Sequence, residues 1–234
     1  MDPSAGRFES AAAVIFDLDG TLVETEQIWR DVRRQFAVQR GGRWRDDAQE
    51  TMIGMRTAEW ARYMRDDLAV PLPAEEIARL VVDGVVARLR KGVPILPGAE
   101  AALQRVAGAF RLGLATSAAR PVAETVLAQT GWAKYFQTVV SADEVARGKP
   151  APDVYLRALA TIRAEGSHSA AVEDSSNGIR SAHAAGLATI AIPNREFLPD
   201  AAALALAART LPALSALDAA VIVSVLRSRY EARS

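Results

Sequence analysis

A single stretch, Val14 to Leu22, constrains the fold of this chain more than any other feature. It continues an apolar, β-branched run from Ala11 to Phe16, which is typical of a strand buried on both faces of a parallel sheet. The run ends in two carboxylates, Asp17 and Asp19, followed by Gly20, which permits a tight turn. Ligands bind at the carboxyl ends of strands in such sheets, and the i, i+2 spacing would point both acids to one side if strand geometry persists. An ordinary polar turn has the same residues, so the rest of the chain must decide between the two interpretations.

The overall composition excludes several classes of function. The 28 Lys and Arg residues balance 28 Asp and Glu residues, so nothing indicates a nucleic-acid partner. Without cysteine, the chain cannot form disulfides, thiolate nucleophiles or Cys-based metal sites. No apolar run approaches the roughly 20 residues of a membrane span, and charged residues precede the first apolar stretch, unlike in a secretory signal. We therefore expect a soluble, cytoplasmic protein, a monomer or weak dimer, with no membrane partner.

The segment after the first strand is predicted to be helical throughout. The predicted helices cover residues 26–39, 57–68 and 74–91. No convincing strand pattern occurs between residues 25 and 92, and the Pro- and Gly-rich segment 92–98 follows. We therefore predict that residues 25–92 form an inserted all-helical domain, and that residues 1–24 and 93–234 together form a second domain, the core.

Strand and helix patterns alternate in the remainder of the chain. The predicted strands cover residues 111–115, 138–141, 170–172 and 188–192, and the predicted helices cover residues 99–107, 121–129, 152–164 and 177–185. Strands alternating with helices imply a parallel sheet covered on both faces. The predicted fold class is therefore α/β, a doubly wound Rossmann-like sheet with an all-helical insertion. Two further segments, 201–208 and 214–226, are predicted to be helical and receive no functional assignment.

Polar side chains follow three further predicted strands. They are Thr116 and Ser117 after the second strand, Lys149 after the third, and Glu173 and Asp174 after the fourth. Each has an ordinary explanation when it is taken alone: a helix cap, a solvated charge or an acidic turn. Because the carboxyl ends of parallel strands meet at one edge of a sheet, all of them in this order predict one site shared with Asp17 and Asp19.

The charges of this predicted site indicate what would bind there. Four carboxylates beside one ammonium cannot all remain ionised in a partly buried site without further positive charge. An all-oxygen cluster without cysteine suits a hard divalent cation, Mg²⁺ first. The metal, the Lys149 ammonium and a hydroxyl together would receive a phosphoryl group. One carboxylate could then attack phosphorus to form an aspartyl-phosphate, and another could move the proton.

These motifs resemble those of the haloacid dehalogenase superfamily, in the branch that contains β-phosphoglucomutase and sugar-phosphate or phosphoglycolate phosphatases. The resemblance covers nearly the whole chain. The matching motifs are Asp17-Leu-Asp19-Gly-Thr-Leu, Leu114-Ala-Thr116-Ser, Ser141-Ala-Asp-Glu-Val with Gly148-Lys149-Pro-Ala-Pro-Asp, and Val172-Glu173-Asp174-Ser-x-x-Gly178-Ile.

The resemblance implies catalytic roles for individual residues. Asp17 would be the nucleophile and Asp19 the general acid and base. Thr116, Ser117 and Lys149 would hold the phosphoryl oxygens.

The resemblance also implies a metal site and a cap. Asp17, the main-chain carbonyl of Asp19, and Asp174 would bind Mg²⁺, with Glu173 either as a ligand or behind the ligands. The superfamily places a helical cap between the first and second motifs, which is where residues 25–92 lie.

Within the superfamily, Asp19 argues against dehalogenation, because dehalogenases lack this second acid and halide departure needs no proton. β-Phosphoglucomutase carries a histidine at the position of Trp29, whereas the segment Glu26-Gln-Ile-Trp29 resembles bacterial sugar- and sugar-alcohol-phosphate phosphatases. We therefore expect a Mg²⁺-dependent phosphatase acting on a small phosphomonoester, such as a sugar, sugar-alcohol or glycolate phosphate. A β-phosphoglucomutase-like mutase and a non-catalytic binding module remain alternatives.

Two residues of the insertion are candidates for substrate specificity. Arg56 ends the segment Met52-Ile-Gly54-Met-Arg56, which resembles the cap turn facing the catalytic edge, and Trp29 lies in the first predicted helix. A surface charge for Arg56 and a place in the core of the insertion for Trp29 and Trp60 are the alternatives.

Overall fold

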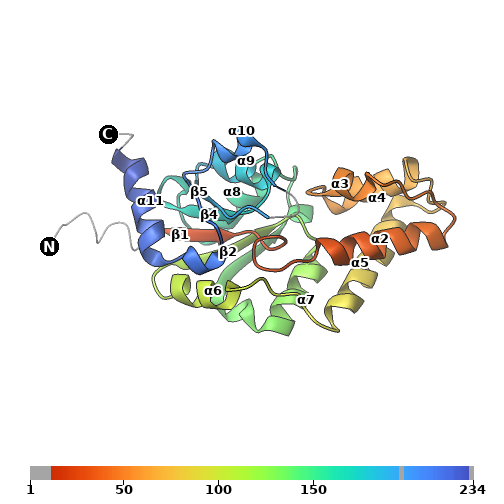
Figure 1. Ribbon diagram of the computed structural model, residues 1–234, viewed down its shortest axis with the longest axis horizontal. Coiled ribbons are helices and arrows are strands. Elements are labelled where there is room, and N and C mark those ends of the chain that lie inside the picture. Colours follow the sequence, from red (N-terminus) through yellow and green to blue (C-terminus); the bar gives the residue numbers. More distant parts are fainter. Residues whose placement is uncertain (1–11, 195–197, 232–234) are drawn as a thin grey trace.

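The computed structural model describes residues 12–194 and 198–231. Its six strands form one parallel sheet in the order β3-β2-β1-β4-β5-β6 (Figure 1). The strands are β1 (Ala13–Phe16), β2 (Arg111–Thr116), β3 (Phe136–Ser141), β4 (Ala170–Glu173), β5 (Ala188–Ala191) and β6 (Arg209–Thr210). The first strand, β1, lies in the centre of the sheet, and the following strands extend first to one edge and then to the other, so the predicted doubly wound α/β fold is confirmed.

The alternation of side chains along β1 explains the helical layers on the two faces of the sheet. Val14 and Phe16 belong to one apolar cluster, and Ala13 and Ile15 belong to another. The first cluster includes α6 (Ala99–Ala107), α7 (Arg120–Thr130) and α11 (Ala219–Glu231); the second includes α8 (Asp153–Thr161) and α9 (Ser176–Ala184). Figure 1 shows α8 and α9 above the sheet and α6 and α7 below it. All four residues of β1 are buried because helices cover both faces.

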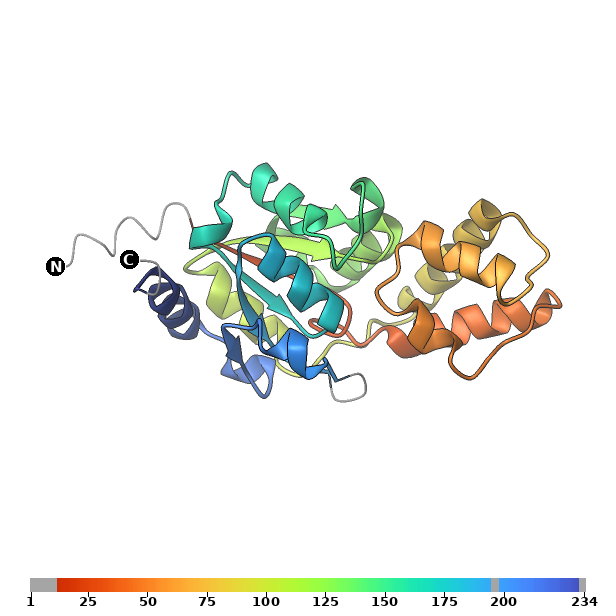
Figure 2. The ribbon, with the colours of Figure 1, turned by 90° about the horizontal axis from the view of Figure 1, so that it is seen from above.

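Residues 25–92 project from the carboxyl edge of the sheet as a group of helices (Figures 1 and 2). The helices are α2 (Glu26–Gln39), α3 (Ala48–Met52), α4 (Thr57–Asp66) and α5 (Ala74–Leu89), and the described residues of this segment contain no strand. Close packing of α2 on α5 depends on Gly84, since a Cβ there would lie 2.9 Å from the side chain of Val32. We call residues 25–92 the insertion.

Two chain segments connect the insertion to the sheet, and they lie side by side. The amide of Glu24 donates to the carbonyl of Pro94 at 2.8 Å, and the amide of Leu96 donates to the carbonyl of Leu22 at 3.0 Å. Val23 and Ile95 pair between them in an antiparallel bridge. The entry and exit of the insertion are therefore joined into a two-stranded connection.

Most predicted elements are present, and the differences lie in short elements. The predicted helix 201–208 is only α10 (Ala201–Leu204), because the chain then turns to pair β6 with the edge of β5. A two-residue strand and the five-residue α3 are too short to show periodicity in the sequence. Ala11, predicted as the first strand residue, lies outside the described residues.

Among the described residues, the structure has no helix of the length and apolar character that crossing a membrane requires.

Candidate active site

A cavity of about 370 Å³ lies between the carboxyl edge of the sheet and the insertion. The core lines it with residues that include Asp17, Asp19, Thr116, Ser117, Lys149, Asp174 and Asn177. The insertion lines it with residues that include Glu26, Trp29, Arg33, Glu50, Gly54 and Trp60. The cavity therefore brings together residues that are far apart in the sequence, as the alternating strand and helix pattern predicted for the core residues.

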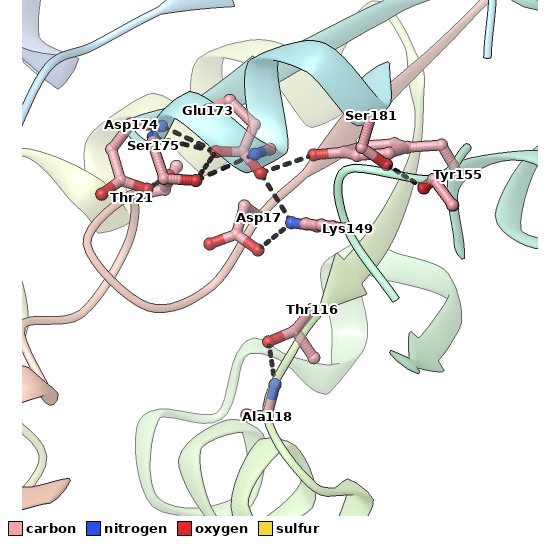
Figure 3. Close-up of polar contacts among 12 residues, drawn as sticks. Asp17, Thr21, Thr116, Ala118, Lys149, Tyr155, Glu173, Asp174, Ser175 and Ser181 are labelled. Atoms are coloured by element: carbon pink, nitrogen blue, oxygen red, sulfur yellow. Dashed lines mark hydrogen bonds and ion pairs between the residues drawn. The ribbon is translucent and has the colours of Figure 1, made fainter. Parts of the chain in front are cut away.

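Lys149 occupies the centre of the site and contacts two carboxylates (Figure 3). Its Nζ lies 2.5 Å from Oδ1 of Asp17 and 2.6 Å from Oε1 of Glu173. Asp17 follows β1 directly, and Glu173 ends the neighbouring β4, so the sheet itself sets the spacing of the two acids. All three side chains are buried, which strengthens the ion pairs because little water screens them.

Glu173 is held by more partners than any other carboxylate of the site. Its Oε1 accepts from Lys149 Nζ and from the hydroxyl of Tyr155 at 2.9 Å. Its Oε2 accepts from the amides of Asp174 and Ser175 and from the Ser175 hydroxyl, at 3.0 to 3.1 Å (Figure 3). Gly178 leaves room for this carboxylate, since a Cβ there would lie 1.7 Å from Oε1. Glu173 thus joins Lys149 to the start of α9.

Asp17, Glu173 and Asp174 each offer an oxygen within 4.8 Å of the others. Asp174 is oriented by the hydroxyl of Thr21, which donates to its Oδ1 at 3.0 Å. Gly20 has a positive φ of 82° and approaches Asp174 so closely that a Cβ would lie 2.1 Å from its Oδ2. This buried, all-oxygen donor set is of the kind that suits a hard divalent cation.

Burial makes the carboxyl groups of Asp17 and Asp174 resist ionisation. It is the main reason that the pKa of Asp17 is raised to about 8, although the Lys149 ammonium acts in the opposite direction. The pKa of Asp174 is raised well above its ordinary value, first by burial and then by the charges of Glu173 and Asp17. Burial acts to lower the pKa of Lys149, but the two carboxylates it contacts outweigh burial and raise it. One ammonium for three buried carboxyl groups leaves the cluster short of positive charge, and a divalent cation would supply it.

Asp19 lines the same cavity but stands apart from the three clustered carboxyl groups. Strand geometry ends at Phe16, so the condition for the i, i+2 expectation, a strand that continues through Asp19, is not met. Its Oδ1 accepts a short hydrogen bond from the hydroxyl of Thr25, directly before α2. Burial raises the pKa of Asp19 to about 7, opposed by the Thr25 hydrogen bond and assisted by the charges of Glu26 and Glu24. A carboxyl group with such a pKa can both donate and accept a proton near neutral pH.

The end of β2 contributes the polar residues predicted there. Thr116 is buried, and its hydroxyl accepts from the amide of Ala118 at 3.0 Å (Figure 3). Ser117 follows it and is partly exposed to the cavity. A hydroxyl and main-chain amides at this turn are suitable donors for phosphoryl oxygens.

The two candidate specificity residues of the insertion lie in different places. Trp29 lines the cavity, with its ring in edge contact with that of Trp60 at 5.9 Å between centroids. Arg56 is not among the residues that line the cavity. Its guanidinium instead donates to the carbonyls of Val145 and Ala146, at 3.2 and 2.9 Å, and therefore joins the insertion to the core.

A comparison with protein families identifies the family of this chain. The model of the haloacid dehalogenase-like hydrolases matches residues 14–192, a range that includes Asp17, Asp19, Thr116, Ser117, Lys149, Glu173 and Asp174. The chain belongs to this family. The resemblance inferred from the four motifs is therefore confirmed.

Members of the haloacid dehalogenase-like family with known structure or description resemble this chain over most of its length. The crystal structure of CbbY from Rhodobacter sphaeroides in complex with phosphate superposes with a TM-score of 0.82 at 30% identity, covering 91% of this chain and 99% of that one. The fructose-1-phosphate phosphatase YqaB of Escherichia coli is 29% identical over 77% of this chain and 95% of its own. The bifunctional riboflavin kinase/FMN phosphatase of Arabidopsis thaliana is 28% identical over 79% of this chain. The matched region spans about half (49%) of the length of that protein.

Several residues of the site were not singled out from the sequence. Tyr155 acts through a hydrogen bond to Glu173 and Thr25 through one to Asp19, and the sequence carries no signal for either. Arg33 could have been noticed, because it follows Trp29 by four residues and so lies on the same face of the predicted helix. A charged residue on a buried helical face requires an explanation.

Proposed function

We propose that this protein is a phosphatase that hydrolyses a small phosphomonoester, such as a sugar, sugar-alcohol or glycolate phosphate, through an aspartyl-phosphate on Asp17. The supporting observation is the position of the buried Asp17 carboxylate, 2.5 Å from the Lys149 ammonium and beside two further carboxyl groups, in a cavity that the insertion also lines. Phosphatases among the relatives, which act on fructose 1-phosphate and FMN by their names, support the same reaction class.

In the first step an Asp17 oxygen attacks phosphorus, and the bond from phosphorus to the ester oxygen breaks. Lys149 holds the carboxylate in place, and the Lys149 ammonium with Thr116 and Ser117 binds phosphoryl oxygens as negative charge builds on them. Asp19 donates its proton to the departing alkoxide. Water then attacks phosphorus while Asp19 takes the proton, and release of phosphate restores the Asp17 carboxylate.

The donor set fits Mg²⁺, which Asp17, Asp174 and the main-chain carbonyl of Asp19 would hold. When bound, the cation supplies positive charge that draws the phosphoryl group to Asp17 and offsets the charge developing on it. We assign Glu173 a different task, because both of its oxygens already accept hydrogen bonds from other residues. Glu173 positions Lys149 and the start of α9.

We also propose that residues 25–92 act as a cap domain on a core made of residues 1–24 and 93–234. The paired connections at Glu24–Pro94 and Leu22–Leu96 provide a site about which such a domain could move. Closure would exclude bulk water and bring Trp29 and its neighbours against the organic part of the substrate.

Two alternatives from the sequence remain to be separated from hydrolysis. A mutase must protect its aspartyl-phosphate from water while a sugar intermediate turns round, and the β-phosphoglucomutase histidine corresponds to Trp29 here. Neither histidine of the chain, His168 or His183, is among the described residues that line the cavity. A non-catalytic binding module would not require Asp17, Asp19 and Lys149 together.

The deciding experiment follows free phosphate and isomerised sugar phosphate in the same reaction. With Mg²⁺, a hexitol or hexose phosphate is expected to release phosphate stoichiometrically. β-Glucose 1-phosphate with a bisphosphate activator should yield little glucose 6-phosphate. Isomer formation much faster than phosphate release would identify a mutase, and no turnover of any ester, aryl phosphate included, would favour a binding module.

A further inference from the structure

Arg33 of α2 is a buried cation on the cavity wall opposite the reacting carboxylates. Only 5% of its surface is exposed, and its Cζ lies 4.6 Å from the ring centroid of Trp29 and 4.9 Å from that of Trp60. The two indole rings therefore hold the guanidinium by cation–π contacts. Burial lowers the pKa of Arg33 to about 10, with the charges of Glu26 and Asp19 opposing the change, so the group is charged at neutral pH.

The guanidinium has far fewer hydrogen bonds than it can make. It carries five N–H donors, yet within the described chain its hydrogen bonding is one long contact, 3.4 Å from Nη1 to Oε1 of Gln49. Its Nε is buried without a partner, and no described carboxylate lies within 4.0 Å of it. A buried charge in this condition costs free energy unless a ligand completes its bonding.

The neighbours of Arg33 indicate which kind of ligand would make the remaining hydrogen bonds of its guanidinium. Gln49 donates to Oε2 of Glu26 at 2.7 Å, and Glu26 and Glu50 line the same wall of the cavity. This wall therefore offers a donor, two carboxylate acceptors and the faces or edges of two indoles. Hydroxyl groups on a carbon chain can donate to the carboxylates, accept from the guanidinium and place their C–H groups on the rings.

The charges of the wall argue against a second anionic group. Among the described residues of the insertion, the charged residues that line the cavity are Glu26, Glu50 and Arg33, two negative and one positive. A distal phosphate or carboxylate placed against them would meet two carboxylates as well as the Arg33 cation, and like-charge contacts are unfavourable in a partly buried site. A neutral, hydroxyl-bearing group meets no such opposition.

We propose that Arg33, held between Trp29 and Trp60, is a specificity-determining residue that binds a hydroxyl of the leaving group, and that the substrate is the monophosphate of a neutral polyhydroxylated compound. The proposal rests on the phosphatase activity proposed above, since phosphorus at Asp17 directs the rest of the substrate toward this wall. It excludes bisphosphates and short carboxylate-bearing esters as preferred substrates.

The experiment compares four esters with the full-length wild-type protein and Mg²⁺: p-nitrophenyl phosphate, sorbitol 6-phosphate, fructose 1,6-bisphosphate and 2-phosphoglycolate. We expect kcat/KM for sorbitol 6-phosphate to exceed that for the bisphosphate and for phosphoglycolate by at least about tenfold. A preference for either anionic ester would overturn the proposal. Turnover of the aryl phosphate without turnover of sorbitol 6-phosphate would also overturn it, while leaving the proposed phosphatase activity intact.

Variants then test the residue itself. Arg33→Met should lower kcat/KM for sorbitol 6-phosphate by about 10- to 100-fold, mainly through KM, and change that for the aryl phosphate by less than about threefold. Arg33→Lys should recover part of the loss, and Arg34→Met, on the exposed side of α2, is the matched control. Equal losses with both esters would mean that Arg33 only supports the insertion and would overturn the proposal. If Arg33→Met does not fold, the substrate preferences of the wild-type protein and of Arg33→Lys decide.

Discussion

The two walls of the cavity differ in how completely their polar groups are satisfied before a ligand arrives. On the core wall, Glu173 accepts from five donors, and Lys149 bridges it to Asp17. On the insertion wall, the equally buried Arg33 makes one long hydrogen bond and otherwise rests on two aromatic rings. Both walls bury charge, but Lys149 on the core wall forms ion pairs, whereas no described carboxylate lies within 4.0 Å of the Arg33 guanidinium.

This difference matches the different requirements of groups that take part in the reaction and groups that bind the rest of the substrate. A reacting group must be in place before the transition state forms, because reorganising dipoles during the reaction would add to the barrier. A recognising group gains most when its remaining hydrogen bonds are made by the ligand. We therefore expect changes on the core wall to affect every substrate alike, and changes on the insertion wall to depend on the leaving group.

The strongest test of the core wall is Asp17→Asn. The amide is a poor nucleophile and a weaker metal ligand, so kcat should fall by about 10⁴- to 10⁶-fold for all esters, on the scale of other nucleophile removals. Circular dichroism and thermal unfolding should show a retained fold. Near-normal phosphate release by a sequence-verified Asp17→Asn sample would contradict the mechanism.

Removal of divalent cations should come next in size. Excess chelator should reduce phosphate release by more than about 100-fold, and added Mg²⁺ should restore it, whereas Ca²⁺ should restore little because its coordination is looser.

Apparent Mg²⁺ affinity should rise from pH 5 toward pH 8, because the pKa of Asp17 in the metal-free site is about 8 and a proton competes with the cation below it. Titration calorimetry at several pH values measures this, and an affinity that falls over the range would contradict the raised pKa.

Gly178→Ala tests whether the packing around Glu173 matters for catalysis. The added Cβ would lie 1.7 Å from Glu173 Oε1, so the carboxylate must move and Lys149 loses its orientation. We expect kcat/KM to fall by about 10- to 100-fold for all esters, with a loss of about 1–3 kcal/mol in the free energy of unfolding. Gly108→Ala is the matched control, since its φ is −68° and its Cβ would find no atom closer than 3.8 Å. Equal effects of the two substitutions would show that the Glu173 contact is unimportant.

Arg56→Met sharpens the comparison, because Arg56 belongs to the insertion but its guanidinium donates to the core carbonyls of Val145 and Ala146 and to Glu59 of its own helix. If it joins the two parts, kcat/KM should fall by about 3- to 10-fold for every ester, aryl phosphate included. Arg62→Met, exposed on the same helix, should change little. A loss confined to sorbitol 6-phosphate would instead return Arg56 to the role of a substrate-binding residue that its sequence motif indicated.

The regular periodicity of the sequence was enough to predict the α/β fold and its helical insertion. Buried strands such as Ala13–Phe16 and amphipathic helices such as Glu26–Gln39 leave local patterns of two and 3.6 residues. Short elements such as β6 leave none, because two residues carry no period. β6 forms because β5 would otherwise be an edge strand with unpaired main-chain groups.

By itself, the sequence determined which core residues meet, because parallel strands place the residues after their carboxyl ends along one edge whatever the side-chain details. Asp17, Thr116, Lys149 and Asp174 were predicted together for that reason. Only the tertiary structure decided that Asp19 turns to Thr25, that Glu173 is saturated with donors, and that Arg56 lies away from the cavity wall. It also decided that Arg33 is buried with no ion pair to any described carboxylate. Those outcomes depend on side-chain rotamers and, apart from the Asp19–Thr25 hydrogen bond, on contacts between elements distant in the chain. No local sequence pattern specifies either.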